Sequence, residues 1–162
     1  MNKISVLMCI YEGDNTYHFK EALESLLPNS KYFSELILVI NGEINKYKIS
    51  IINKYKKNLK IKLVKLKNNV GLSRGLNIGI TKAKYQWIAR FDSDDFCTED
   101  RFKKASRIIS IYSNELDVFG TYIQEFNFDI NNLSYERKVP LISRDINKRL
   151  IVAESIYGIY FN

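Results

Sequence analysis

The stretch IARFDSDDF, residues 88–96, joins the end of an apolar strand to three carboxylates, Asp92, Asp94 and Asp95. Carboxylates so close together repel one another, and removing them from water is unfavourable unless a cation compensates. In an extended segment, residues two apart point the same way, so Asp92 and Asp94 are expected to converge while Asp95 points elsewhere. Carboxylate oxygens are ligands that suit Mg²⁺ or Mn²⁺. The stretch therefore predicts a site for one of these cations at the end of a buried strand.

Strands and helices alternate on both sides of this stretch. Apolar runs predict strands at residues 3–11, 35–41, 61–67, 85–91 and 116–126. Apolar residues at helical spacing predict helices at residues 18–27, 44–58, 72–83 and 100–114. Strict alternation is typical of right-handed βαβ units, in which helices cover both faces of a mainly parallel sheet. The predicted fold class is therefore α/β.

Polar residues follow each of the first four strands. The strand ends read CIYEGD (9–14), INGE (40–43), KNN (67–69) and FDSDD (91–95). In open α/β sheets, ligands bind in the crevice beyond the carboxyl ends of the strands. We therefore expect one ligand to contact several of these four ends.

Gly71, Gly75 and Gly79 recur every four residues, from just before the third predicted helix into it, so they share one helix face. Close packing of this helix on the sheet explains the spacing better than a phosphate-binding loop, since the Gly-x-x-x-x-Gly-Lys-Ser/Thr pattern is absent.

Composition restricts the setting of the protein. The chain has 162 residues, a size that suits one domain or a fragment of a larger protein. Two distant cysteines favour a reducing cytosol over a disulfide framework. No apolar stretch approaches the roughly 18 to 20 residues of a membrane span. The sequence thus predicts a soluble or peripheral cytoplasmic protein.

The net charge of +7 includes seven lysines within residues 54–67. Such a segment can contact anionic lipid, nucleotide phosphates or nucleic acid. It also fits a solvated helix end and a strand that guards a sheet edge, which is the interpretation we favour. No recognised nucleic-acid-binding motif accompanies the charge, so a nucleic-acid partner is not expected.

Over roughly residues 3–126 the sequence resembles the family 2 glycosyltransferases of the GT-A fold. ISVLMCIYEGD (4–14) is similar to the opening strand of that family, and ELILVINGE (35–43) occupies the place of its Val-Asp-Asp-Gly-Ser signature. NVGLSRGLNIGITKAKYQWIARFDSDD (69–95) resembles its central signature, and DRFKKA (100–105) resembles the helix that follows. The resemblance implies transfer of a sugar from a nucleotide-sugar donor with inversion, as in bacterial O-antigen, capsule or exopolysaccharide synthesis.

The resemblance also assigns roles around the nucleotide. Cys9 and Tyr11 match positions that line the base, and Glu12 stands where the family usually has asparagine. Asn41 matches an aspartate that accepts the uracil N3 proton, which is a departure from the family pattern. Arg74 matches a basic residue near the diphosphate.

The same resemblance places the three aspartates in the catalytic centre. It implies that Asp94 is the direct metal ligand and that Asp92 reaches the ribose or shares the metal. Arg90 and Asp95 lie beside them and are expected to orient these carboxylates.

The implied enzyme moves a sugar, with UDP-sugar as the expected donor, to a lipid-linked or polysaccharide acceptor at the inner face of the cytoplasmic membrane. We expect a nucleotide-sugar-binding domain at 1–140 and a divergent tail at 141–162, with the acceptor-binding region largely missing. Glu154 is the only carboxylate of the segment IVAESIYGIYFN (151–162) and only a weak candidate for the general base.

Two alternatives remain open. One is a truncated donor-binding remnant with little or no transfer activity. The other is a sugar nucleotidyltransferase, which shares the alternating architecture. That class needs a glycine-rich, lysine- or arginine-bearing loop after the first strand, and YEGDN (11–15) does not supply one.

Overall fold

The structure is a computed structural model that describes residues 3–126, 133–137 and 159–161. The chain divides into two compact units, residues 1–117 with 161–162 and residues 118–160. The boundary expected near residue 140 falls outside the described residues.

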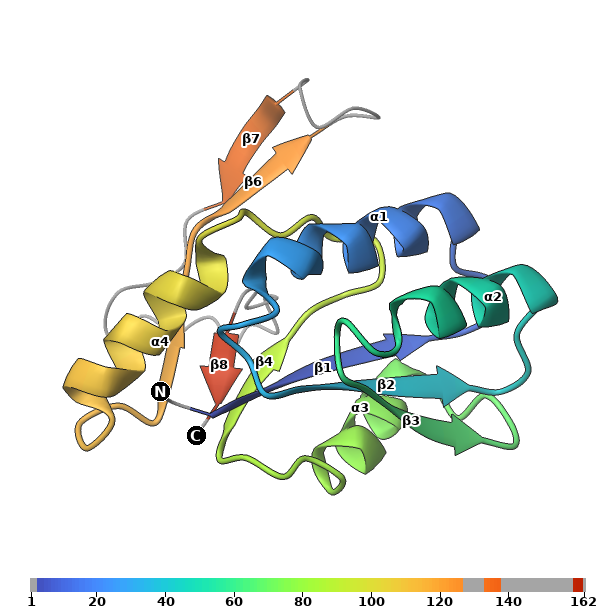
Figure 1. The fold of residues 1–162 in the computed structure, drawn as a ribbon, viewed down its shortest axis with the longest axis horizontal. Coiled ribbons are helices and arrows are strands. Elements are labelled where there is room, and N and C mark those ends of the chain that lie inside the picture. The colour runs from blue at the N-terminus through green and yellow to red at the C-terminus, as the bar shows by residue number, and fades with distance from the viewer. Residues whose placement is uncertain (1–2, 127–132, 138–158, 162) are drawn as a thin grey trace, which may run out of the picture. The chain divides into compact units, whose positions relative to one another are not determined.

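A parallel sheet forms the centre of the first unit (Figure 1). Its strands are β1 (Ile4–Ile10), β2 (Glu35–Asn41), β3 (Ile61–Leu66) and β4 (Trp87–Arg90), in the order β3-β2-β1-β4. Val6 in β1 pairs with Leu36 on one side and Ala89 on the other. Every residue of β1 is buried, as expected for a strand covered on both faces. The predicted α/β class and mainly parallel sheet are confirmed in this unit.

Helices cover the sheet on both sides. Those of the first unit are α1 (Thr16–Leu26), the 3₁₀ turn η1 (Leu27–Asn29), α2 (Lys46–Tyr55), α3 (Leu72–Ile80) and α4 (Arg101–Tyr112). Figure 1 shows α1 and α2 on one face of the sheet and α3 on the other. The side chains of Asn15 and Asn45 accept backbone N–H bonds at the starts of α1 and α2. These caps set the helix starts at Thr16 and Lys46, two residues from the predicted ones.

The glycine face of α3 packs against the sheet as predicted. A Cβ on Gly79 would lie 2.5 Å from the Leu7 side chain and 2.8 Å from that of Val39. A Cβ on Gly75 would lie 3.0 Å from the sulfur of Cys9. Gly71 has open space around it instead and a φ of +84°, a backbone angle that favours glycine.

The strand predicted at 116–126 is two strands, which corrects the sequence-based prediction. β5 (Val118–Gly120) ends at a glycine, which offers no side chain for packing. β6 (Ile123–Phe126) instead forms an antiparallel pair with β7 (Leu133–Arg137). The second unit also contains most of β8 (Ile159–Phe161). No local sequence pattern indicates that residues 123–126 pair with a later segment.

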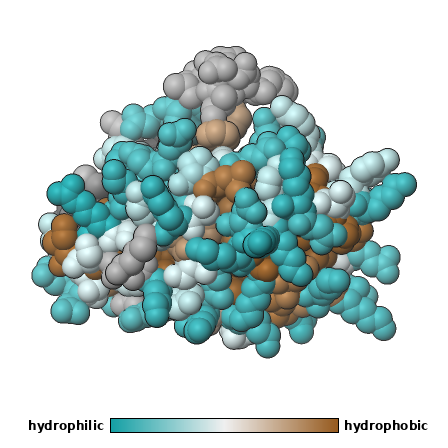
Figure 2. Space-filling view, in the orientation of Figure 1, coloured by the Kyte–Doolittle hydropathy of each residue, from teal (hydrophilic) through white to brown (hydrophobic). Residues whose placement is uncertain are grey.

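The surface is mixed in character. On the face drawn in Figure 2, hydrophilic side chains interrupt the apolar areas. Of the helices in the described part of the chain, none has the length and apolar character needed to cross a membrane.

Candidate functional site

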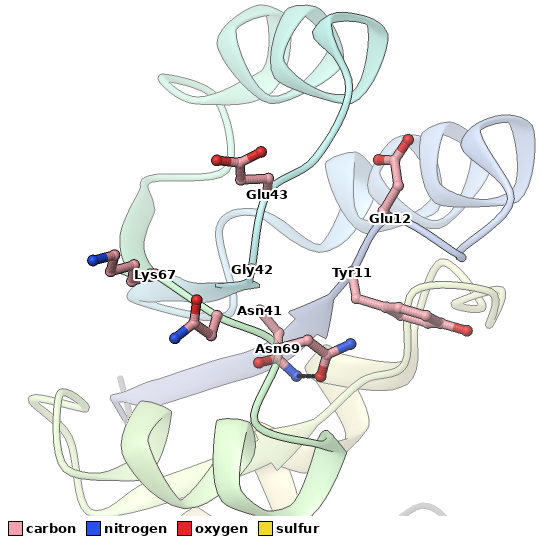
Figure 3. A pocket seen from close by; sticks show the side chains of 8 residues that line it. Tyr11, Glu12, Asn41, Gly42, Glu43, Lys67 and Asn69 are labelled. Atoms are coloured by element: carbon pink, nitrogen blue, oxygen red, sulfur yellow. Dashed lines mark hydrogen bonds between the residues drawn. The ribbon is translucent and has the colours of Figure 1, made fainter.

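A pocket of about 330 Å³ opens where β1, β2 and β3 end (Figure 3). Its lining residues are Tyr11, Glu12, Asn41, Gly42, Glu43, Lys67, Asn68 and Asn69. In Figure 3, Tyr11 and Glu12 stand on one side, Lys67 on the opposite side, and Asn41 with Asn69 between them. Three of the four polar strand ends identified in the sequence thus meet at one pocket.

Asn41 is buried and uses its amide group to hold the loop before α3. Its Nδ2 donates to Asn69 Oδ1 at 3.0 Å and to the Gly71 carbonyl at 3.1 Å. Its Oδ1 accepts from the Val70 N–H at 2.9 Å. Both N–H groups of the amide are used, so the side chain can offer a ligand only the remaining lone pair of its oxygen.

Glu12 is likewise engaged within the protein. Its carboxylate accepts from the Asn45 N–H at 2.8 Å and from Asn45 Nδ2 at 3.1 Å. The Asn45 side chain, then the Asn45 N–H and the charge of Lys48, hold the pKa of Glu12 below its ordinary value. The carboxylate therefore fixes the turn after β1 while it lines the pocket.

The three aspartates lie in a tight turn, which corrects the expectation of an extended segment. β4 ends at Arg90, and the Asp95 N–H donates to the Asp92 carbonyl at 3.3 Å. Aspartate and serine favour such turns because their side chains bond to nearby backbone. The alternation that predicted a common direction for Asp92 and Asp94 therefore does not apply here.

Each aspartate has a different environment. Asp92 accepts two hydrogen bonds from the Arg90 guanidinium, at 3.0 and 2.8 Å. Such a direct contact is what the expected orienting role of Arg90 requires. Asp94 is exposed and has no hydrogen-bond or ion-pair partner among the described residues. Loss of hydration, and then the charges of Asp92 and Asp94, raise the pKa of Asp95.

The described residues contain no group of three or more His, Cys, Asp or Glu side chains that could hold a metal ion unaided. A cation such as Mg²⁺ often takes only one or two carboxylates and completes its shell with substrate phosphate and water. The exposed carboxylate of Asp94 fits that kind of ligand set. Asp92 fits it less well, because Arg90 occupies both of its oxygens.

Of the other predicted residues that the structure describes, Cys9 and Arg74 do not line the pocket. Cys9 lies in the core beneath α3, where burial, then the charges of Asp14 and Asp92, raise the pKa of its thiol to about 11. Arg74 is exposed in the first turn of α3. Glu154 falls outside the described residues.

Some pocket residues were not singled out from the sequence. Glu43, Lys67 and Asn68 line the pocket, although the sequence assigned them no individual role. The signal available was their place in the strand ends INGE and KNN, which predicted a ligand without saying which side chain contacts it.

The family model of glycosyl transferase family 2 matches residues 5–156. An uncharacterized glycosyltransferase of Haemophilus influenzae is 34% identical over 146 residues, which are 90% of this chain and 54% of the relative. The UDP-Gal:alpha-D-GlcNAc-diphosphoundecaprenol beta-1,3-galactosyltransferase of Escherichia coli is 30% identical over 138 residues, 85% of this chain and 50% of the relative. The chain spans about half the length of these curated relatives.

Solved structures share the fold. Residues 1–349 of Staphylococcus aureus TarS, in complex with UDP-GlcNAc, superpose with a TM-score of 0.69 at 24% identity. The match covers 86% of this chain and 37% of that one. The fold is therefore the GT-A type that the sequence resemblance implied.

Proposed function

The chain belongs to glycosyl transferase family 2, and from that premise we propose that its first unit binds the UDP-sugar donor of an inverting glycosyltransferase. The observation that carries this proposal is the polar pocket at the carboxyl ends of β1, β2 and β3. That edge of a parallel sheet is where α/β proteins bind nucleotides. The E. coli relative, whose name includes UDP-Gal, supports the choice of uridine.

The pocket suits a nucleoside because its polar groups both donate and accept. The exposed amide of Asn68 can serve as either, Lys67 donates, and Glu43 accepts. Asn69 can donate through its NH₂ group, because its Oδ1 already accepts from Asn41 Nδ2 and from the Gly71 N–H. Asn41 is proposed to support the pocket through its loop contacts, with one oxygen lone pair left for the base.

Asp94 is proposed to bind Mg²⁺ or Mn²⁺ together with the donor diphosphate, with Asp92 as a weaker participant. When bound, such a cation offsets the charge of the nucleoside diphosphate that leaves. The Arg90 guanidinium, which donates to both carboxylate oxygens of Asp92, is proposed to hold Asp92 beside this cation. Asp95 is proposed to support the turn that presents Asp94.

The proposed acceptor is a lipid-linked saccharide in surface-polysaccharide synthesis, because the name of the E. coli relative contains diphosphoundecaprenol. Inversion requires a base for the acceptor hydroxyl, and this role stays open in the described residues. The proposed setting is the cytoplasmic face of the membrane. Lys60 and Lys62 of the basic segment 54–67 donate to backbone carbonyls within the fold, so only part of its charge is available to lipid.

The experiment is calorimetric titration of the chain with UDP, GDP and dTDP in the presence of Mn²⁺. We expect UDP to bind most tightly. Equal or tighter binding of GDP or dTDP would overturn the choice of uridine, and no binding of any of them would overturn the donor site. Transfer from radiolabelled UDP-sugars to a lipid-linked acceptor, measured separately, distinguishes an active transferase from a donor-binding remnant.

A further inference from the structure

Lys48 is the one charged residue buried in the described part of the chain, with 1% of its surface exposed. It lies in the first turn of α2, and its ammonium donates to the backbone carbonyl of Glu12 at 2.5 Å. The Glu12 carboxylate lies 3.5 Å away. Burial of an ammonium group is unfavourable unless it is paired and hydrogen-bonded, and Glu12 supplies both contacts to Lys48.

Asn45 connects the same two elements. Its Oδ1 caps α2 by accepting from the N–H groups of Tyr47 and Lys48, both at 3.0 Å. Its own N–H and Nδ2 donate to the Glu12 carboxylate. Glu12, Asn45 and Lys48, which we call the Glu12 latch, thus tie the start of α2 to the turn after β1.

The latch holds one side of the pocket. The turn that it fixes contains Tyr11 and Glu12, both of which line the pocket. Within the turn the Tyr11 N–H donates to Asp14 Oδ2 at 3.0 Å. The Tyr11 ring lies so close to Gly13 that a Cβ there would be 2.5 Å from it. The backbone of the turn and the direction of the ring are therefore set together.

We infer that Lys48 is a positioning residue for the donor nucleotide, which acts through Glu12 to keep the Tyr11–Glu12 side of the pocket in its binding position. The inference rests on the proposed function, because it names a determinant of that same donor site. Lys48 does not line the pocket, so its effect on binding must pass through the turn. A site whose wall is already ordered loses less entropy when the ligand binds.

The first experiment needs no ligand. Amide hydrogen exchange is compared in the wild type, Lys48→Met and Lys54→Met. Lys54 lies in the same helix but is exposed, with its ammonium 3.9 Å from Glu24, and serves as the matched control. We expect Lys48→Met to accelerate exchange at Tyr11 and Asn45 while the central strands keep their protection. Unchanged exchange at these residues, or a uniform increase throughout the chain, would contradict the latch.

The second experiment measures UDP affinity in the presence of Mn²⁺ for Lys48→Met, Glu12→Gln and the double variant. We expect each single variant to weaken binding on the order of tenfold and the double variant to be little worse than the weaker single one, because both break one latch. Glu12→Gln keeps the buried lysine, so it still tests the latch if Lys48→Met does not fold. Wild-type binding that Lys48→Met leaves unchanged, or fully additive losses, would overturn the inference alone. A wild type that binds no nucleotide would overturn the proposed function as well.

Discussion

Polar residues at the strand ends form hydrogen bonds with the protein's own loops, which limits what they can offer a ligand. Asn41 and Glu12 were both expected to contact the nucleotide, and both line the pocket. Asn41 nevertheless forms three hydrogen bonds with residues 69–71, and the Glu12 carboxylate accepts from Asn45. The Asn41 amide satisfies two acceptors, which the aspartate implied by the family resemblance could not do.

Asn41→Asp is therefore expected to destabilise the fold. The new carboxylate cannot donate to the Gly71 carbonyl or to Asn69 Oδ1 and would repel both oxygens. We expect the free energy of unfolding in urea to fall by about 1–3 kcal/mol. Asn68→Asp is the control, because Asn68 is exposed in the same pocket and should change by less than about 0.5 kcal/mol. Equal stability of Asn41→Asp and the wild type would refute this role.

Contacts from other elements hold the start of α4. Its own N-cap residue, Asp100, makes no capping bond. The buried Asn29 of η1 instead accepts from the Phe102 N–H at 3.1 Å and donates to the Thr98 carbonyl at 2.9 Å. Ser25 of α1 accepts from the Cys97 N–H at 3.0 Å. These bonds fix the segment that directly follows the aspartate turn.

Asn29→Ala should remove both of its bonds, so that the Phe102 N–H at the start of α4 loses its side-chain acceptor and the Thr98 carbonyl loses one of its donors. We expect a loss of about 2 kcal/mol or more in the free energy of unfolding, measured in urea. Asn53→Ala, an exposed position in α2, is the matched control and should stay within about 0.5 kcal/mol of the wild type. If the two variants unfold alike, the cap from η1 contributes nothing.

Sequence patterns predicted the parallel sheet, the glycine face of α3 and the strand ends that meet at the pocket. Each of these features depends on residues that lie close together along the chain. Lys48 and Glu12 are 36 positions apart, and Asn29 and Phe102 are 73 positions apart. No local sequence pattern therefore indicates these contacts. The aspartate turn was missed for another reason, because β4 ends at Arg90 and the chain turns between Asp92 and Asp95, where the alternation of a strand no longer applies.

The acid stability of the molecule should depend on Glu24. The hydroxyl of Tyr55, and then the ammonium of Lys20, lower the pKa of Glu24 below its ordinary value of 4.5. A group whose pKa is lower in the folded state adds stability above its unfolded pKa and loses it as the pH falls through the folded value. Asp95 acts in the opposite sense, because its pKa is raised.

Thermal unfolding between pH 3 and pH 7 tests this dependence. The wild-type melting temperature should fall below about pH 4.5, and Glu24→Gln should lower it near neutral pH while flattening the acid decline. Parallel curves for the two proteins would show that Glu24 makes no contribution.

We infer that this chain binds a nucleotide-sugar donor through a cation at Asp94. Calorimetric titration with a UDP-sugar, with and without Mn²⁺, tests it most directly in the wild type, Asp94→Asn and Asp92→Asn. Asp100→Asn is the control, because Asp100 pairs with Lys104 in α4. We predict binding that requires the metal, is lost in Asp94→Asn, is reduced less in Asp92→Asn and is unchanged in the control. Tight binding that is independent of metal and unaffected by Asp94→Asn would show that the donor does not bind through a cation at Asp94.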